Sequence, residues 1–221
     1  MSIAQQLHEV WNQLPDRTRL VAVSKFHPLT VIREAYDAGQ RIFGESRVQE
    51  LVTKYEELPG NIIWHFIGHL QTNKVKYIVP VIDMIESVDS LHLLREIDLQ
   101  GRKFNRRVHV LLQIHIAAEE TKFGFTFDEC RQLLLSGEVR KMKNVCVCGL
   151  MGMATFTENQ SLIRTEFAGL ADFFKKIKQE FFENDPEFRE ISMGMSDDYL
   201  LAIEEGSTLV RIGSKLFGQR I

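Results

Sequence analysis

Short apolar runs alternate with amphipathic helical patterns eight times along this chain. Such runs, bounded by turn signals, are typical of buried parallel strands, and the segments between them repeat apolar residues at the spacings of a helix. The expected strands are Leu20–Lys25, Arg41–Gly44, Asn61–Gly68, Val81–Glu86, Arg107–Ile116, Val145–Met151, Glu190–Met193 and Thr208–Ile212. Eight strands, each followed by a helix, predict an α/β fold, a (β/α)₈ TIM barrel, although an open doubly wound sheet has the same alternation.

Local signals predict where the helices begin and end. An extra amphipathic helix occupies the N-terminus, and a helix near Leu91–Leu99 is expected to end before Gly101. Three helices are expected to begin with capping boxes, formed by Ser46 with Gln49, Thr126 with Glu129, and Thr157 with Gln160. No linker or shift in composition separates a second domain, so residues 1–221 are expected to form a single barrel domain.

Composition excludes several classes of function. The net charge of the 221 residues is −3, so nothing points to nucleic acid or a charged membrane surface as a partner. No apolar run is long enough to cross a membrane and no secretory signal is evident, which favours a cytoplasmic protein. Cys146 and Cys148 would point the same way on a strand, but no second Cys/His pair completes a metal site. The sequence therefore predicts reduced thiols and no metal.

Lys25 directly follows the apolar run Leu20–Ser24, and a helical pattern starts at Pro28. The lysine is therefore expected at the carboxyl end of a strand, the edge at which barrels and open α/β sheets bind ligands. A lysine at that edge is either a solvated loop residue or an amine that acts as a nucleophile.

Two glycine-containing turns follow the last two expected strands, Ser192–Ser196 (SMGMS) and Arg211–Ser214 (RIGS). Phosphate is bound by exposed backbone N–H groups, which need glycine for close approach, and by helix N-termini. The candidate phosphate-binding residues are Ser192, Gly194, Ser196, Gly213 and Ser214. The alternative is that both glycines only make tight turns and the serines only cap helices.

In a closed barrel these turns are neighbours of Lys25. That arrangement suits pyridoxal 5'-phosphate, a phosphorylated aldehyde that forms a Schiff base with a lysine. We expect Arg211 near the ring nitrogen, because a guanidinium cannot accept a proton and leaves that nitrogen unprotonated. His65 and His69 are expected to be ordinary hydrogen-bonded histidines.

Seven segments resemble the pyridoxal phosphate homeostasis proteins, which have the alanine-racemase-like barrel. They cover the chain in order: AVSK at Ala22–Lys25, FGESRVQEL at Phe43–Leu51, WHFIGHLQTNKVK at Trp64–Lys76, TKFGF at Thr121–Phe125, GLMGMA at Gly149–Ala154, and SMGMSDD with STLVRIGSKLFG near the C-terminus. One departure is Ser46, where the family commonly has asparagine.

The resemblance implies that Lys25 holds the cofactor as an aldimine, that the two turns surround its phosphate, and that Arg211 faces the pyridine nitrogen. It also implies a barrel without the C-terminal β domain of the racemases. The family's members look like non-catalytic carriers that buffer the cofactor and pass it to pyridoxal phosphate-requiring enzymes through transient contacts. A monomer or weak dimer is expected.

Two other functions stay open at this point. One is a pyridoxal phosphate-dependent racemase or decarboxylase on the bare barrel. The other is an aldolase that uses Lys25 as its Schiff-base lysine without any cofactor.

Overall fold

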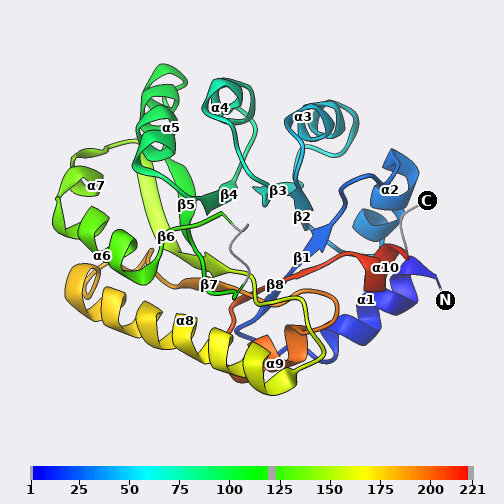
Figure 1. Ribbon diagram of the computed structural model, residues 1–221. Coiled ribbons are helices and arrows are strands. Elements are labelled where there is room, and N and C mark those ends of the chain that lie inside the picture. The colour runs from blue at the N-terminus through cyan, green and yellow to red at the C-terminus, as the bar shows by residue number, and fades with distance from the viewer. Residues whose placement is uncertain (1, 119–122, 219–221) are drawn as a thin grey trace.

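The strands form a closed barrel in which every neighbouring pair runs parallel (Figure 1). The computed structural model describes residues 2–118 and 123–218. Its strands are β1 Arg19–Val23, β2 Ile42–Glu45, β3 Ile63–Phe66, β4 Met84–Val88, β5 Val108–Ile114, β6 Val145–Gly152, β7 Glu190–Ser192 and β8 Leu209–Ile212. β1 pairs with β8 over four residues, Val21 opposite Arg211 among them, and this closure confirms the barrel and excludes the open sheet.

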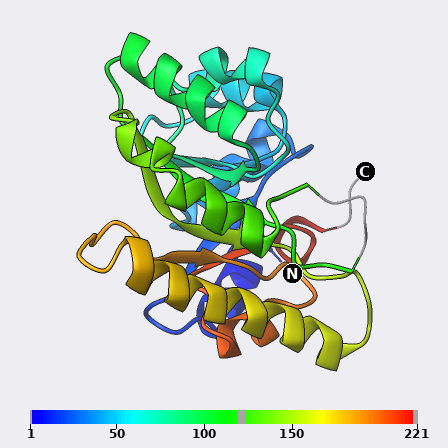
Figure 2. The same ribbon diagram turned by 60° about the vertical axis from the view of Figure 1, so that its left-hand side comes forward.

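The helices form a ring outside the barrel (Figures 1 and 2). They are α1 Ile3–Trp11, α2 Leu29–Asp37, α3 Val48–Glu57, the 3₁₀ helix η1 Thr72–Lys74, α4 Val75–Ile78, α5 Leu91–Lys103, α6 Phe127–Leu135, α7 Glu138–Lys141, α8 Gln160–Phe181, α9 Tyr199–Glu204 and α10 Ser214–Phe217. α1 is the expected N-terminal helix. The longest helix, α8, buries an apolar stripe that includes Phe167, Leu170 and Phe174.

The core has two layers because side chains alternate between the two faces of each strand. The larger layer lies between the barrel and the helices and contains Leu20, Ala22 and Phe43. The smaller layer fills the barrel itself and consists of Val21, Ile42, Leu111, Cys146, Cys148, Met151 and Leu209. Apolar burial on both faces explains why the strands read as continuous apolar runs in the sequence.

Two of the three predicted capping boxes are wrong, and the third is confirmed. Thr126 and Glu129 bond each other's backbone as expected at the start of α6. The N-cap of α3 is Arg47 rather than Ser46, and the Ser46 backbone lies close to Gly68. α8 begins after Asn159, whose side chain accepts a hydrogen bond from the Leu162 N–H.

The predicted end of α5 is also wrong. The helix continues through Gly101 to Lys103. A Cβ at Gly101 would lie 2.8 Å from both the Arg106 carbonyl oxygen and the Asn144 Cβ. The glycine therefore allows close packing against the following strands and does not end the helix.

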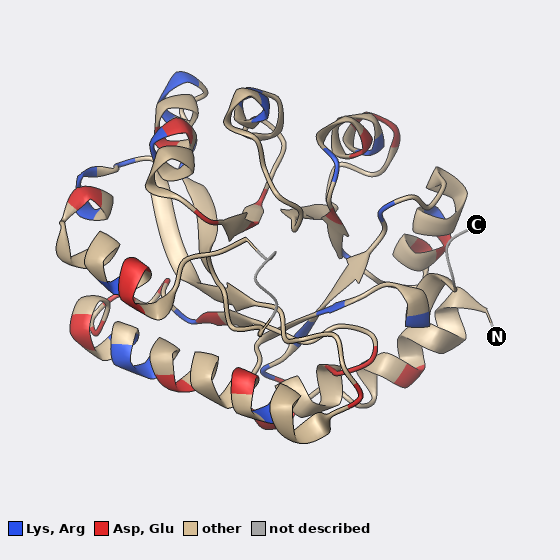
Figure 3. Cartoon of the chain, in the orientation of Figure 1, with Lys and Arg blue, Asp and Glu red and all other residues tan. Residues whose placement is uncertain are grey.

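Charged residues of both signs are distributed over the outer helices, and α8 carries both acidic and basic positions along its length (Figure 3). The mixture agrees with the small net charge of −3. None of the helices in the described part of the chain combines the length and the apolar character that a membrane span requires.

Candidate functional site

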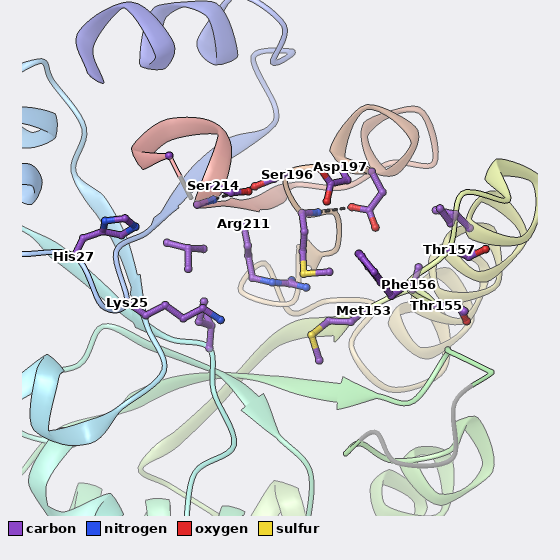
Figure 4. Close-up of a pocket in the computed structure, with 18 residues that line it drawn as sticks. Lys25, His27, Met153, Thr155, Phe156, Thr157, Ser196, Asp197, Arg211 and Ser214 are labelled. Atoms are coloured by element: carbon purple, nitrogen blue, oxygen red, sulfur yellow. Dashed lines mark hydrogen bonds between the residues drawn. The ribbon is translucent and has the colours of Figure 1, made fainter. Parts of the chain in front are cut away.

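A cavity of about 280 Å³ lies at the carboxyl end of the barrel strands. This volume suits a small ligand. In Figure 4 the Lys25 and Arg211 side chains extend into the same space, with Ser196 and Ser214 along one edge and Phe156 on another side. The remaining lining residues are Val23, His27, Ile67, Met153, Ala154, Thr155, Thr157, Ile163, Met195, Asp197, Asp198, Gly213 and Gly218.

Five of the seven residues proposed from the sequence line this cavity: Lys25, Ser196, Arg211, Gly213 and Ser214. Ser192 and Gly194 are not among its lining residues. Ser192 is fully buried behind Arg211, and the Gly194 carbonyl accepts a hydrogen bond of 2.9 Å from the Arg211 N–H. Both residues contact the arginine and do not reach the cavity themselves.

The two glycines are required for different reasons. Gly213 approaches the end of β1 so closely that a Cβ would lie 3.2 Å from both the Cβ and the carbonyl oxygen of Val23. Its N–H donates to the Ser196 hydroxyl over 3.3 Å, which joins the two turns. Gly194 has φ +93°, and a Cβ there would lie 2.6 Å from the Ala202 Cβ. Gly194 therefore serves the packing of α9, while Gly213 gives its turn a close approach to the cavity wall.

Arg211 is fixed by a network inside the barrel. Its Nη1 donates to the Ser192 hydroxyl, its Nη2 donates to the Gly152 carbonyl over 2.9 Å, and Glu86 Oε2 lies 3.8 Å from Nη1. Ser192 in turn donates to Glu86 over 2.5 Å. Burial lowers the pKa of Arg211, and the Glu86 charge opposes that change.

His65 completes this inner network, since its Nδ1 lies 2.6 Å from Glu86 Oε1. Burial alone would raise the pKa of Glu86, but the hydrogen bond and charge of His65, with the Arg211 charge and the Ser192 hydroxyl, lower it. His69 is paired with Asp89 over 3.0 Å. The expectation that both histidines are hydrogen-bonded is confirmed.

A second network lies outside the barrel wall, against α3, and holds the turn that carries Lys25. The buried Lys54 ammonium donates to the Ser24 carbonyl over 2.9 Å, to Glu45 Oε1 over 2.7 Å and to Glu50 over 3.1 Å. Glu45 also accepts from the Ser24 hydroxyl over 2.6 Å. These contacts fix the backbone immediately before Lys25.

The residue after Lys25 has an uncommon conformation. Phe26 has φ +67°, in the left-handed region that bulky side chains rarely adopt. Its N–H donates to Glu50 over 2.8 Å, so the carboxylate stabilises this turn. The strained turn directs the Lys25 side chain into the cavity, while Ser24 faces α3.

Sequence reasoning identified Arg211 and Ser192 but missed Glu86 in the inner network, and it missed Ser24, Glu45, Glu50 and Lys54 of the outer network. Glu45 and Glu86 stand at the carboxyl ends of expected strands, which is the one local signal that could have suggested them. Lys54 lies within a predicted helix and carries no such signal. Asp198, which the sequence suggests is solvated, lines the cavity, and its carboxylate accepts from the Met195 N–H.

The cavity residues fit a small phosphorylated aldehyde. Lys25 is a primary amine able to condense with a carbonyl, and the joined turns offer hydroxyls and closely approaching backbone. Asp198 is already engaged by a backbone N–H, which limits its repulsion of an anion in the cavity. Arg211 supplies a buried positive charge at the cavity floor.

Comparison with known proteins supports this description. The family "Alanine racemase, N-terminal domain" matches residues 2–221. The pyridoxal phosphate homeostasis protein of Aquifex aeolicus is 40% identical over 203 residues, which cover 91% of this chain and 87% of that protein. The protein of the same name from Schizosaccharomyces pombe is 40% identical over 204 residues, covering 91% and 84%.

The chain belongs to the pyridoxal phosphate homeostasis protein family. The resemblance noted in the sequence is thereby confirmed, as is the alanine-racemase-like barrel. PipY from Synechococcus elongatus, whose solved structure has pyridoxal phosphate bound, is 37% identical to this chain. The two structures superpose with a TM-score of 0.88, and the alignment covers 98% of this chain and 100% of PipY.

The alanine racemases are more distant from this member of the homeostasis protein family. The enzyme of Clostridium difficile is 14% identical with a TM-score of 0.78, and the alignment covers 99% of this chain but 56% of the racemase. The likeness to the racemase concerns the fold alone.

Proposed function

We propose that this protein binds pyridoxal 5'-phosphate through a Schiff base with Lys25 and serves cofactor homeostasis without proficient turnover. The observation that carries the proposal is the cavity in which one lysine, one buried arginine and two glycine turns meet. Two findings on relatives support it: PipY has pyridoxal phosphate bound, and the curated relatives are named homeostasis proteins.

Each cavity residue has a role in the proposal. Lys25 supplies the amine, and Ser196, Gly213 and Ser214 bind the phosphate. Arg211 faces the ring nitrogen. Ser192 and Gly194 do not contact the cofactor themselves. They form hydrogen bonds with Arg211 and hold it in place.

The same arginine argues against proficient catalysis. A protonated ring nitrogen needs a partner that accepts its hydrogen bond, such as a carboxylate. The Arg211 guanidinium, which Glu86 and Ser192 hold in place, only donates hydrogen bonds and therefore does not stabilise that proton. An unprotonated ring is a weaker electron sink for reactions at the amino-acid α-carbon. Racemase or decarboxylase activity is the alternative function, and the amino-acid racemisation and decarboxylation assays described below test it.

The test of the site is borohydride reduction of the protein with pyridoxal phosphate, followed by mass spectrometry. We expect the adduct on Lys25 alone, its loss in Lys25→Ala, and its retention in the control Lys74→Ala. An adduct on another lysine would contradict the assignment. Amino-acid racemisation or decarboxylation by the wild type at about 1 s⁻¹ or faster would overturn the carrier function while leaving the site intact.

A second measurement tests the phosphate-binding turns. Charge-assisted hydrogen bonds contribute about 1.5–3 kcal/mol each. Unphosphorylated pyridoxal is therefore expected to bind at least about 100-fold more weakly than pyridoxal phosphate. Equal affinity for both would show that the turns do not bind phosphate.

The proposed setting is the cytoplasm, where the protein passes its cofactor to pyridoxal phosphate-requiring enzymes through transient contacts, as a monomer or weak dimer. The cavity opens at the end of the barrel, where another protein could approach it. Transfer is tested by adding the loaded protein to a cofactor-free enzyme and comparing its reactivation with that by free cofactor. Light scattering measures the oligomeric state.

A further inference from the structure

A group of metal-ligand side chains lies at the amino-terminal end of the barrel, opposite the cofactor cavity. His109, Cys146, Cys148 and Glu187 each offer one ligand atom, and these four atoms lie within 4.8 Å of one another. In the sequence the two cysteines have no ligand partner nearby. The fold supplies both missing donors, His109 from β5 and Glu187 from the segment that precedes β7.

Strand pairing explains how the group forms. His109 is the direct partner of Cys146 in the parallel β5–β6 pair, so both side chains lie on the same face. The register then shifts, because Val110 pairs with Val147 while Leu111 pairs with Gly149. Cys148 is the extra residue of this irregularity. It lies two residues after Cys146 on β6, and the alternation of side chains along a strand places both cysteines in the barrel interior.

The next residue makes this irregularity possible. Gly149 has φ +154°, and a Cβ there would lie 1.8 Å from the Glu190 carbonyl oxygen. No other residue fits between β6 and β7 at this point. The irregularity directly after Cys148 is thus built into the sheet.

The spacing of the sulfurs matches a tetrahedral metal. The two Sγ atoms are 3.7 Å apart. Zinc–sulfur bonds of about 2.3 Å at tetrahedral angles separate two sulfurs by about 3.8 Å. His109 Nδ1 lies 3.3 Å from the Asp83 carbonyl oxygen, and a proton on that nitrogen leaves Nε2 as the donor to a metal.

Burial and charge at the group also suit a cation. Cys146 and Cys148 are 2% and 3% exposed, His109 is half-buried and Glu187 is exposed, so solvent reaches the group from the Glu187 side. The Glu187 carboxylate at this open side offers an anionic oxygen ligand of a kind that zinc accepts in proteins.

We propose that His109, Cys146, Cys148 and Glu187 bind one zinc ion at the amino-terminal end of the barrel. Each thiol releases its proton to solvent as its sulfur bonds the metal, so two protons leave for each ion bound. The ion would join β5, β6 and the segment before β7. It would therefore stabilise the barrel at the end opposite Lys25.

The proposal is tested by titrating metal-free, reduced protein with Co²⁺ in oxygen-free buffer. We expect one cobalt per chain, with thiolate-to-cobalt charge-transfer absorption and the intense visible bands of a tetrahedral site, both abolished by one equivalent of zinc. Weak bands of a six-coordinate ion, or no charge-transfer absorption, would overturn the site.

Variants assign the ligands. Loss of a residue that only hydrogen-bonds a metal ligand weakens metal binding by about 10–100-fold. Cys148 is proposed as a ligand itself, so Cys148→Ser is expected to weaken zinc binding by more than about 100-fold. Cys130→Ser is the matched control, since Cys130 is buried outside this group. Glu187→Gln changes an exposed residue that cannot disturb the core, and its amide oxygen can still bond a metal weakly. It is therefore expected to weaken binding by only about 10-fold. Wild-type affinity in both Cys148→Ser and Glu187→Gln would refute the proposal.

Discussion

Two buried ionic networks support the cavity, and they differ in how completely their carboxylates are bonded. The inner network, His65, Glu86, Ser192 and Arg211, lies inside the barrel, and both oxygens of Glu86 have partners. The outer network joins Ser24, Glu45, Glu50 and Lys54 against α3. There, Glu45 Oε1 accepts two hydrogen bonds, while the buried Oε2 has no partner among the described residues.

The pKa values of the two carboxyls move in opposite directions for this reason. The partners of Glu86 outweigh its burial and lower its pKa. Burial outweighs the Lys54 charge at Glu45 and raises its pKa. The inner network thus depends on an ionised carboxylate beside Arg211. The outer network mainly positions backbone, because its lysine bonds the carbonyl that precedes Lys25.

Glu86→Gln should have the largest effect on stability. It leaves the buried Arg211 without its counter-charge, which typically costs about 3–5 kcal/mol in the free energy of unfolding. Denaturant unfolding of the cofactor-free protein measures the loss, and Glu9→Gln at an exposed position of α1 is the control. A loss below about 1 kcal/mol would mean that Arg211 does not need this charge.

Lys54→Met should cost less, about 1–3 kcal/mol, because Glu45 already has a raised pKa and can become neutral. The larger consequence is expected at Lys25, since the variant loses the bond to the Ser24 carbonyl. We expect pyridoxal phosphate affinity, followed by the absorbance of the lysine adduct, to fall by about 10-fold. Lys76→Met is the control. Unchanged affinity for pyridoxal phosphate would show that the outer network does not position Lys25 for binding.

The two serines of the networks provide a matched pair. Ser192→Ala removes a hydroxyl that bonds both Arg211 and Glu86, and it should cost about 1.5–3 kcal/mol because both partners are charged. Ser24→Ala removes one bond to Glu45 and should cost about 1 kcal/mol. Denaturant unfolding compares them, and a larger loss for Ser24→Ala would reverse the ranking of the two networks.

The smallest expected effect is the dependence of stability on pH, and its sign differs between the networks. Glu86 has a pKa below its ordinary 4.5 in the folded protein, so its ionised form adds to the free energy of unfolding at pH values above 4.5. This stabilisation is lost as the pH falls through the folded-state pKa. Glu45 has a pKa above 4.5 in the folded protein, so its ionisation lowers the free energy of unfolding at pH values above that folded-state pKa. This destabilisation disappears as the pH falls to 4.5.

This prediction is checked by the unfolding free energy of the wild type relative to Glu86→Gln and to Glu45→Gln across the acidic range. The first difference should fall and the second should rise as pH decreases. Differences with the same sign would show that the two carboxyls do not differ as described.

Patterns within the sequence predicted eight parallel strands and placed Lys25 and the two glycine turns at their carboxyl ends. They did not distinguish a closed barrel from an open doubly wound sheet, which the pairing of β1 with β8 decided. A parallel strand buried on both faces leaves an apolar run, and its carboxyl end is marked where that run stops, so Lys25 and the turns could be placed at one edge. Helix starts were less certain. Serine and threonine fit several positions in a first turn, and the α3 and α8 caps fall on Arg47 and Asn159.

Only the tertiary structure decided which buried charges meet. Glu86 and Ser192 are 106 positions apart in sequence, and they touch because the barrel closes and both face its interior. His109 and Glu187 join Cys146 and Cys148 for the same reason. The periodicity of a strand determines on which face a side chain lies. Which side chain it meets across the barrel depends on closure and register, and neither leaves a local pattern in the sequence.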